Sequence, residues 1–471
     1  MIAAVFDRQF LISRAPFGAA GEWRHIALPA GWVLSAHKDL PIEIEAGRPH
    51  KLVLGHRFCA DPVTGRGAGR YVALDWPVLR NDPVSLMVLF HRCAGAGLGV
   101  ASHPAVLLQA HHGHVPPYDI TDPLGHRDTI NYIPAPATRW HEVRRTFCDQ
   151  AIDLEDGALV HADHGIRPMD SFEAARDTVA DELCRFAEEA RARIPGRIFL
   201  PLTAGLDSRT LAAAFLATGL PFETATLRLA GKPAAEATVA RRISHACGLR
   251  HQILTLRAPD PARRARYAAQ VSDAIENWAL NHTYPGGGYR YLQPGDAMMV
   301  GGCFEIGRKY YAKTLGDFDL AAASGAAIWA RLNKGAPGPT ALTDALDDWK
   351  AWRGAHLDGL DWLAAFYLDQ RLGAWRATYE LGYDLLPGVS LHPANNARIL
   401  SGLITPNPVD QEDGRLQRAV IEKLAPRLLD FPVNPPGLKQ HLRRLVRLPL
   451  GFLHTHLPIP VVQTLKTLQP R

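Results

Sequence analysis

The sequence has few cysteines, no long apolar run and little net charge. Its six cysteines, at positions 59, 93, 148, 184, 247 and 303, are dispersed and form no Cys-x-x-Cys pair, which argues against a zinc site or a thiol relay between neighbours. No stretch reaches the about 18 apolar residues that a membrane span needs, and the N-terminus shows no basic region followed by an apolar core. These absences predict a cytoplasmic protein without a transmembrane segment.

The charge and the length narrow the class of protein further. A net charge of +5 over 471 residues is weak for a nucleic-acid binder, which concentrates basic charge on one face. It is compatible with an anionic small molecule such as a nucleotide. The 47% hydrophobic and 21% charged residues are typical of globular proteins, and the length suggests two or three domains.

The first part of the chain, up to about residue 165, is predicted to be rich in β-structure. Short apolar or alternating runs are separated by glycine, proline and aspartate, which is typical of strands joined by turns. The runs that we interpret as strands are residues 2–6, 32–35, 51–54, 71–74 and 84–90.

The pattern then changes to alternating helices and strands. Apolar residues at helical spacing predict a helix over 171–194, with Asp170 as its N-cap and Glu173 completing a capping box. Most of 257–430 reads as helix. The alternation predicts a parallel sheet with crossover helices, built from strands at 197–202, 222–229, 250–256 and 297–302 with helices at 209–218 and 234–247.

The turn over residues 203–208 is the segment that carries chemistry. It reads Thr-Ala-Gly-Leu-Asp-Ser between a buried strand and a helix. Gly205 permits a tight turn and a close ligand approach, and the start of the helix offers free N–H groups and the positive end of its dipole. Thr203 and Ser208 add hydroxyl groups, so the turn is suited to phosphate. Asp207 repels phosphate, so we expect it to hold a Mg²⁺ ion that bridges phosphate oxygens.

This turn resembles the pyrophosphate loop of the adenine nucleotide α-hydrolase superfamily, whose pattern is Ser-Gly-Gly-x-Asp-Ser. The departure is Ala204 in place of glycine, which requires a negative φ at that position. The resemblance implies an ATP site, and the residues that match its loop or flank it are Leu202, Thr203, Ala204, Gly205, Asp207, Ser208 and Arg209.

Further segments resemble asparagine synthetase-like proteins in particular. Glu236 stands where that family usually has aspartate before a helix, and His251 follows at the matching place. The segment from Gly302 to Tyr310 resembles Gly-Ala-Asp-Glu-Leu-Phe-Gly-Gly-Tyr. Glu305 matches its glutamate, whereas Phe304 replaces the aspartate expected to ligate metal. The resemblance therefore implies a metal site at Asp207 and Glu305, with Arg308 and Lys309, in place of glycines, near pyrophosphate.

The resemblance extends over most of the chain and implies its domains. Residues 1–168 are similar to a class II glutaminase-like (Ntn-type) layer, and residues 169–471 to an ATP-binding synthetase domain. Position 2 is Ile, where the glutaminase needs a cysteine nucleophile, so the first domain is expected to be degenerate. Lys439 is the nearest candidate for a lysine that stabilises the reacting centre in the family. The layout is similar to that of β-lactam synthetases and lasso-peptide cyclases.

These observations predict an α/β, ATP-dependent and AMP-forming amide ligase. A carboxylate is adenylated and then passed to an amine or to ammonia, with ATP and Mg²⁺ as cofactors and Asp207, Glu305 and Lys439 as catalytic residues. Two alternatives stay open: an intramolecular cyclase and a non-catalytic nucleotide-binding scaffold. A tRNA-sulfurtransferase-like enzyme is disfavoured by the missing paired cysteines. A homodimer or a complex with biosynthetic partners is also expected.

Overall fold

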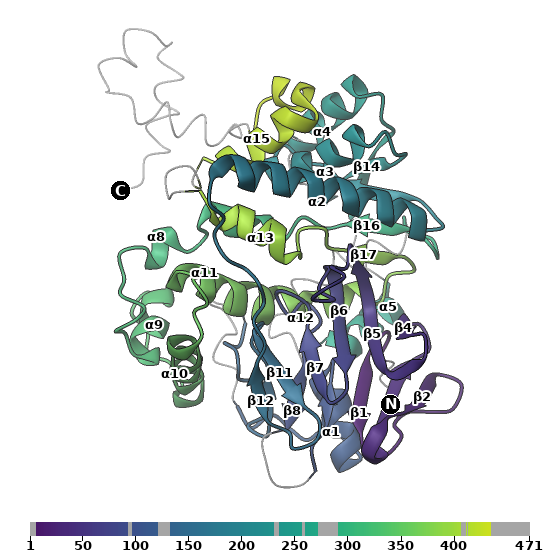
Figure 1. Ribbon diagram of the computed structural model, residues 1–471, viewed down its shortest axis with the longest axis vertical. Helices are drawn as coiled ribbons and strands as arrows, with labels where there is room; N and C mark the ends of the chain where they lie inside the picture. Colours follow the sequence, from purple (N-terminus) through teal and green to yellow (C-terminus); the bar gives the residue numbers. More distant parts are fainter. Residues whose placement is uncertain are drawn as a thin grey trace.

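The computed structural model shows a mixed α/β protein. It describes residues 6–92, 97–120, 132–229, 235–256, 260–271, 291–406, 411 and 413–434. The strands of two antiparallel sheets lie in the lower half of Figure 1, and a parallel sheet with helices around it occupies the upper half. The α/β class predicted from the sequence is therefore confirmed, whereas the domain boundary near residue 168 stays a prediction.

The antiparallel sheets face each other across an apolar layer. Leu52 and Leu54 of one sheet and Phe10 and Ile12 of the other belong to one buried cluster, because alternate side chains of a strand point to the same face. Sheet A has the order β10 (Val143–Arg145), β8 (Phe90–Arg92), β9 (Val100–Ala101), β1 (Phe10–Ser13), β3 (Val33–His37) and β2 (Trp23–Ala27). Sheet B has the order β12 (Leu159–His161), β11 (Gln150–Asp153), β7 (Val78–Asn81), β6 (Ala68–Asp75), β5 (Arg48–Phe58) and β4 (Ile42–Glu45). The short elements η1 (Pro29–Gly31) and α1 (Pro104–His112) complete this half.

The strand predicted over 84–90 is wrong for most of its length. Only Phe90 belongs to a strand, although residues 84–89 are buried. The carboxylate of Asp82 accepts the N–H groups of Val84, Leu86 and Met87 at 2.9–3.2 Å. Buried backbone donors need partners, and here a side chain supplies them in place of a neighbouring strand. The strand predicted over 2–6 lies almost entirely outside the described residues.

The parallel sheet, sheet C, is the element that positions the candidate site. Its order is β15 (His251–Leu256), β14 (Glu223–Leu229), β13 (Ile198–Pro201), β16 (Ala297–Met299) and β17 (Val389–Leu391). All four pairings are parallel. The chain starts at β13, proceeds outward through β14 and β15, and then returns to the other side of β13. The predicted strands 197–202, 222–229 and 250–256 are confirmed with small shifts, the strand predicted over 297–302 covers only 297–299, and β17 was not predicted.

Helices surround sheet C and extend to one side of it. The predicted helix 171–194 is confirmed as α2 (Phe172–Arg193), but its N-cap is Ser171 rather than Asp170, because the Ser171 hydroxyl accepts the Ala174 N–H at 3.1 Å. The helix predicted over 209–218 begins earlier, as α3 (Leu206–Ala217), and the one over 234–247 is α4 (Ala235–Ala246). The other helices are α5 (Pro261–Val271), η2 (Phe304–Arg308), α8 (Ala312–Leu315), α9 (Gly325–Leu332), α10 (Thr340–Ala355), α11 (Trp362–Phe366), the π-helix η3 (Tyr367–Arg376), α12 (Ala377–Tyr383), α13 (Ala397–Ile404), α15 (Arg415–Leu424) and η4 (Pro426–Asp430).

A buried ion cluster joins the antiparallel half to the helices. The guanidinium of Arg353 in α10 donates to Asp149 at 2.8 Å and to Asp369 at 2.7 Å, and all three side chains are fully buried. Asp149 follows β10 in the antiparallel half, and Asp369 lies in η3. The same carboxylate of Asp369 accepts the indole N–H of Trp349 at 2.9 Å. These contacts hold α10 and η3 against the sheets in one arrangement.

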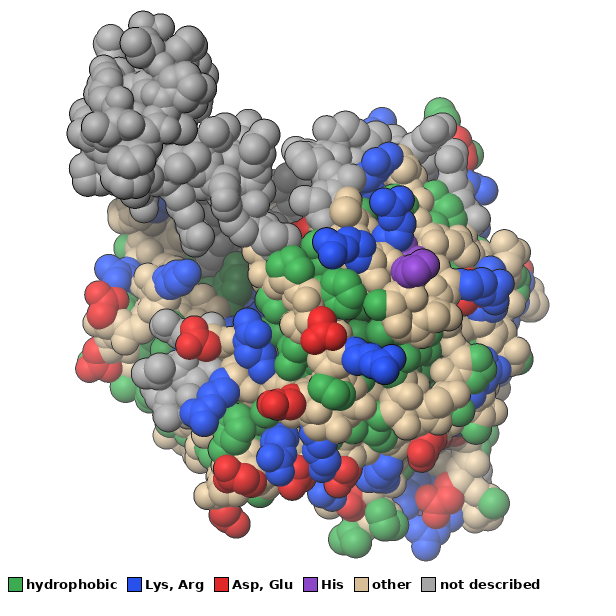
Figure 2. Space-filling view, turned by 90° about the horizontal axis from the view of Figure 1, so that it is seen from above, with side chains coloured by type: hydrophobic (Ala, Val, Ile, Leu, Met, Phe, Trp, Pro, Cys, Tyr) green, Lys and Arg blue, Asp and Glu red, His purple; other side chains and the backbone are tan. Residues whose placement is uncertain are grey.

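The surface shown in Figure 2 carries charged side chains of both signs. In the described part of the chain, no helix is both long and apolar enough to cross a bilayer. On the face shown in Figure 2, basic side chains are interspersed with acidic ones over much of the surface. The predictions about location, nucleic acid and oligomeric state stay predictions.

Candidate functional site

The candidate site lies where the strand order of sheet C reverses. In open α/β sheets, ligands bind outside the carboxyl ends of the strands at such a point. β13 and β16 are parallel neighbours. After β13 the chain continues to β14 on one side of this pair, and after β16 it continues to β17 on the other side. A Cβ atom added to Gly301, after β16, would lie 3.8 Å from the Cβ atom of Asp207 in the first turn of α3. The two segments are therefore in contact at this edge of the sheet.

Hydroxyl groups hold the loop between β13 and α3 in shape. The hydroxyl of Thr203 accepts the N–H of Gly205 at 3.1 Å, and the hydroxyl of Ser208 accepts the N–H of Thr203 at 3.1 Å. Gly205 is the N-cap residue of α3, and no side chain caps this helix. The first turn of α3 therefore keeps the free N–H groups and the positive dipole end that suit an anion.

Two small residues allow the loop to pack closely. Ala204 is described and is not among the residues with a positive φ. An alanine can therefore stand where the pyrophosphate-loop pattern has a glycine. Gly205 has an ordinary extended conformation, with φ −80° and ψ 163°, so its lack of a side chain matters for space and not for backbone freedom. A Cβ atom there would lie 3.3 Å from the Thr203 hydroxyl and 3.5 Å from the side-chain oxygen of Asn434. Asn434 also donates its N–H to the Ala204 carbonyl at 3.0 Å, so the chain near its end passes beside the loop.

Asp207 and Arg308 form an ion pair at the centre of the site. Nη2 of Arg308 lies 2.7 Å from Oδ2 of Asp207, and the two side chains are 29% and 21% exposed. Burial raises the pKa of Asp207 to about 6; the charge of Glu305 also raises it, and Arg308 opposes the shift. Arg308 therefore places one positive charge beside the loop. The sequence analysis predicted that Arg308 lies near pyrophosphate.

Glu305 lies close enough to Asp207 for its charge to act on that carboxyl, and it contacts the π-helix η3. Its carboxylate accepts the hydroxyl of Tyr367 at 3.3 Å and lies 3.8 Å from Nη2 of Arg371. Burial raises the pKa of Tyr367, and the charges of Glu305 and Asp207 raise it further. The site therefore groups Asp207, Glu305 and Arg308 as predicted. It adds Tyr367 and Arg371, which the sequence analysis missed, although their spacing of four residues marks one face of a helix.

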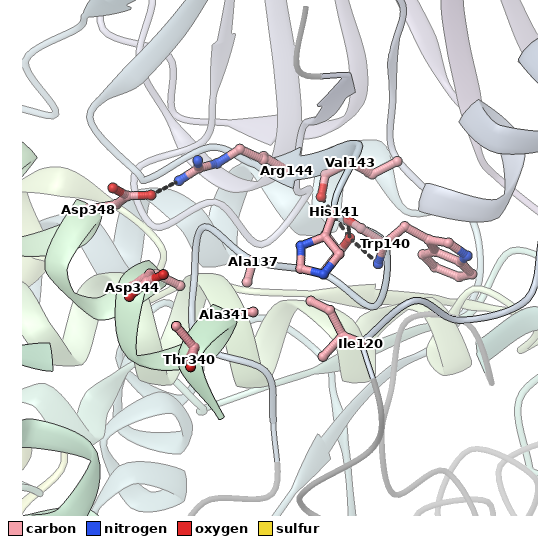
Figure 3. Close-up of a pocket in the computed structure, with 12 residues that line it drawn as sticks. Ile120, Ala137, Trp140, His141, Val143, Arg144, Thr340, Ala341, Asp344 and Asp348 are labelled. Atoms are coloured by element: carbon pink, nitrogen blue, oxygen red, sulfur yellow. Dashed lines mark hydrogen bonds and ion pairs between the residues drawn. The ribbon is translucent and has the colours of Figure 1, made fainter. Parts of the chain in front are cut away.

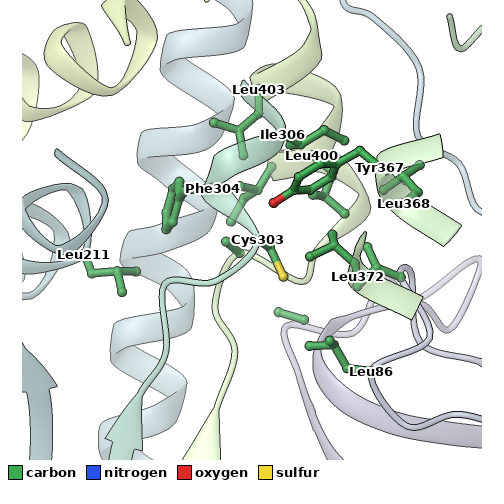
Figure 4. Packing of buried hydrophobic residues seen from close by; sticks show 14 of the residues in the cluster. Leu86, Leu211, Cys303, Phe304, Ile306, Tyr367, Leu368, Leu372, Leu400 and Leu403 are labelled. Carbon is green, nitrogen blue, oxygen red and sulfur yellow. The ribbon is translucent and has the colours of Figure 1, made fainter. Parts of the chain in front are cut away.

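Phe304 belongs to the apolar core next to the site. Figure 4 shows its ring among the buried side chains that also include Leu211 and Leu403. The side chain is fully buried. The position where the resemblance implied a second metal-ligating aspartate is thus part of the packing beneath the site.

The residues present do not fit the magnesium site predicted at Asp207 and Glu305. Oδ2 of Asp207 is paired with Arg308, and Oδ1 is buried without a hydrogen-bond partner. A guanidinium at 2.7 Å also repels a cation. Among the described residues, the groups of three that could hold a metal lie elsewhere, at Cys148, Asp149 and Asp369 and at Asp149, His161 and Asp358. No step of the proposed reaction is therefore assigned to a metal held by these carboxylates.

Two residues of the predicted ATP set have structural roles in the loop. Arg209 is fully buried, and its guanidinium donates to the carbonyls of Ala204, Leu428, Phe431 and Pro432. These bonds brace the loop against the segment after α15 and use donors that a phosphate would need. Leu202 is also buried and donates its N–H to the Ala225 carbonyl of β14 at 2.8 Å. Both side chains are buried within the protein.

The remaining predicted residues lie around or outside this group. Glu236 is exposed in the first turn of α4, and no hydrogen bond or ion pair among the described residues joins it to the loop. The His251 ring is within 2.9 Å of the Thr224 hydroxyl and 3.3 Å of the Ser244 hydroxyl, so it ties β14 and β15 to α4. Lys439 lies outside the described residues, and its role stays a prediction.

A larger cavity lies in another part of the molecule. Its volume is about 670 Å³, and Figure 3 shows residues 137–144 on one side and α10 on the other. Arg144 and Asp348 form an ion pair across it. None of its lining residues belongs to the loop after β13 or to η2, so it is separate from the site described above.

The comparisons with known proteins add little to this description. No protein-family model matches the sequence, and a search of curated proteins finds no match either. Among solved structures, the chain is similar to NMN synthetase from Francisella tularensis, with 14% identity over 42% of this chain and 78% of that one and a TM-score of 0.20. A likeness this weak carries no argument about function. The geometry of the site itself is that of the reversal point of a parallel sheet, with a helix start that no side chain caps.

Proposed function

We propose that this protein is an ATP-dependent, AMP-forming amide ligase. The observation that carries the proposal is the uncapped start of α3 at the reversal point of sheet C, with Arg308 beside it. A helix start and an arginine together suit the phosphates of a nucleotide. The resemblance of residues 203–208 and 302–310 to asparagine synthetase-like proteins supports ATP as the nucleotide. The same resemblance supports a PP-loop type for the parallel-sheet half and a degenerate Ntn-type layer for the antiparallel half.

In the first step, an oxygen of the substrate carboxylate attacks the α-phosphorus of ATP. The bond from that phosphorus to the bridging oxygen breaks, and pyrophosphate leaves with the bonding electrons. The backbone N–H groups at the start of α3 and the guanidinium of Arg308 stabilise the charge that develops on it. Thr203, Ala204, Gly205 and Ser208 form the loop that holds it. Asp207 is a positioning residue in this scheme, because it orients Arg308.

In the second step, an amine nitrogen attacks the carbonyl carbon of the acyl-adenylate. The carbon–oxygen bond to AMP breaks, and the nitrogen loses a proton to give the amide. Glu305 is the carboxylate beside the pair and is proposed to take this proton. Holding both reactants in one site supplies much of the rate. The amine is ammonia or a second substrate, and in the cyclase alternative it belongs to the same molecule as the carboxylate. Glu236 and Lys439 stay predicted contributors.

The test is AMP and pyrophosphate formation by the purified full chain with a panel of carboxylic acids. Asp207→Ala is expected to lower AMP formation by about 100-fold, because Arg308 without its partner no longer holds its transition-state contact in place. Asp317→Ala, an exposed aspartate, is the matched control and is expected to keep full activity. Unchanged AMP formation in Asp207→Ala, with normal folding, would refute the role given to this site.

A non-catalytic scaffold is the second candidate function. The observation in its favour is that Arg308 and Phe304 stand where the resemblance implies glycine and a metal-ligating aspartate. Exchange of labelled pyrophosphate into ATP separates the two proposals. A ligase shows acid-dependent exchange, whereas a scaffold binds ATP and shows none.

A further inference from the structure

A second cluster of ionisable side chains lies where the antiparallel half meets the end of α10. His161 is the last residue of β12, Asp149 directly precedes β11, and Asp358 lies in the turn after α10. Nε2 of His161 lies 2.8 Å from Oδ2 of Asp358 and 4.0 Å from Oδ2 of Asp149. The cluster therefore joins segments that are far apart in the sequence, and none of its residues takes part in the proposed reaction.

A stack of rings holds His161 in place. The rings of His161 and His356 are stacked with centroids 4.5 Å apart, and the ring of Trp352 lies 4.3 Å from that of His356. Trp352 donates its indole N–H to Oδ1 of Asp149 at 3.0 Å, and Nδ1 of His356 donates to the Trp352 carbonyl at 3.0 Å. The position of the His161 ring is therefore set by packing as well as by its contact with a carboxylate.

In the described part of the chain, the carboxylates of this cluster outnumber the cations that pair with them. Arg353 is bonded to both Asp149 and Asp369, so one guanidinium serves two buried carboxylates. Among the described residues, no lysine or arginine lies within ion-pair distance of Asp358, whose partner is His161. Three carboxylates and one guanidinium leave two negative charges uncompensated when all are ionised. Buried charge of one sign is costly unless it is paired, so the cluster favours a bound cation.

Other groups nearby do not supply the missing positive charge. His164 is fully buried, and burial lowers its pKa to about 4, so it is neutral near pH 7. The charge of Arg167 acts on Asp358, but the Arg167 guanidinium is paired with Asp163 at 2.8 Å. Burial raises the pKa of Asp149, and a cation beside this carboxyl would oppose the shift.

The spacing of the possible ligand atoms suits a small divalent ion. Metal–ligand bonds of about 2.0–2.2 Å at tetrahedral angles place two ligand atoms about 3.4 Å apart, and the distances of 2.8 and 4.0 Å from Nε2 of His161 bracket this value. A carboxylate oxygen has two lone pairs, so Oδ2 of Asp149 can keep its bond to Arg353 and also accept an ion. The side chains of His161 and Asp358 are 30% and 16% exposed, so both are partly open to solvent.

We propose that Asp149, His161 and Asp358 bind a divalent metal ion, with Zn²⁺ as the best match. One imidazole nitrogen and two carboxylate oxygens are ligands that Zn²⁺ accepts, and a water molecule completes four-coordination. The ion neutralises the excess negative charge and joins β12 to the turn after α10. The charge balance differs from that at Asp207 and Glu305, where each carboxylate has an arginine of its own, at 2.7 and 3.8 Å.

Titration of the full chain with Zn²⁺ tests this assignment. After treatment with a chelator, the wild type is expected to bind Zn²⁺ in calorimetry, and His161→Gln and Asp358→Asn are each expected to bind one ion fewer per chain. Asp149 is left unchanged, because its loss would also remove a partner of Arg353. Zn²⁺ should also raise the Tm of the wild type more than that of either variant, since a ligand that binds only the folded state stabilises it.

Control variants separate this site from zinc bound by other side chains. His245→Gln, at an exposed histidine of α4, and Asp317→Asn are expected to bind as many ions as the wild type. An equal number of ions in the wild type and in folded His161→Gln and Asp358→Asn overturns the inference. A wild type that binds no Zn²⁺ overturns it as well. The positive charge would then come from a protonated His161, whose imidazole signals in NMR should titrate above the usual pKa of about 6.5.

Discussion

Arg308 and Asp207 are joined by a 2.7 Å ion pair that links the short helix after β16 to the first turn of α3. The pair spans the reversal point of sheet C, so the charge of Arg308 is held beside the loop by a residue of the loop's own helix. Lys309, next in the chain, has a positive φ of 46°, a conformation that glycine adopts most easily.

Loss of Arg308 is expected to weaken nucleotide binding. Arg308→Met keeps the apolar stem and removes the charge, so the Kd for ATP should rise by about 10- to 100-fold, as expected for a hydrogen bond between charged groups. Isothermal titration calorimetry measures this, with Arg331→Met as the control. Equal ATP affinity in the two variants would contradict the placement of phosphate beside Arg308.

The raised pKa of Asp207 predicts a stability that depends on pH. In the unfolded chain the carboxyl ionises near 3.8, whereas in the folded protein its pKa is about 6. Ionisation therefore favours the unfolded state as pH rises from about 4 to 6, at about 1.36 kcal/mol per unit of pKa difference. Asp207→Asn cannot ionise and should be more stable than the wild type above pH 6, by up to about 3 kcal/mol.

Denaturant unfolding at pH 4 and pH 7 checks this prediction. The difference between Asp207→Asn and the wild type should be small at pH 4 and largest at pH 7. Asp317→Asn, at an exposed position, serves as the control and should show no such trend. A variant that loses stability at pH 7 would mean that the charged pair is a net stabiliser.

Metal binding should be independent of Asp207. One of its oxygens is paired with Arg308, and the other is buried, so a divalent ion lacks access to either. Titration of Mn²⁺ followed by electron paramagnetic resonance is expected to give the same number of bound ions for the wild type and Asp207→Asn, without nucleotide. A site that is lost in Asp207→Asn alone would restore the magnesium assignment made from the sequence.

The buried cluster at Arg353 should be essential for stability. Arg353→Met leaves the buried carboxylates of Asp149 and Asp369 without their shared cation, and breaking a buried pair in this way costs about 3–5 kcal/mol. Thermal unfolding should show a clear fall in Tm for Arg353→Met and almost none for Arg331→Met. Equal Tm values would show that these carboxylates are neutral in the folded protein.

The sequence predicted those parts of the fold that depend on local patterns. The apolar spacing in 171–194 predicted α2, and the order of apolar runs and turns from 197 to 256 predicted β13, α3, β14, α4 and β15. The strand predicted over 84–90 was wrong because Asp82, a residue outside the run, supplies its hydrogen bonds. The N-cap of α2 was misplaced by one residue, since Asp170 and Ser171 are both good caps.

In the candidate site too, local motifs predicted some residues, whereas others depend on tertiary packing. Asp207, Glu305 and Arg308 were chosen from motifs that are local in sequence, and the structure brings them together. Arg209 belongs to the same motif, but its guanidinium turns to carbonyls after α15, which no local pattern reveals. Tyr367 and Arg371 were missed because their place beside Glu305 depends on how η3 packs against η2, two segments far apart in the sequence.

By itself, the sequence determined the alternation of strands and helices and the loop that joins β13 to α3, because hydrophobic periodicity and turn residues act over a few positions. Only the tertiary structure decided that Asp207 pairs with Arg308, that Phe304 belongs to the core and that Arg371 lies beside Glu305. Burial and charge pairing arise between segments distant in the chain, so they are properties of the packed molecule.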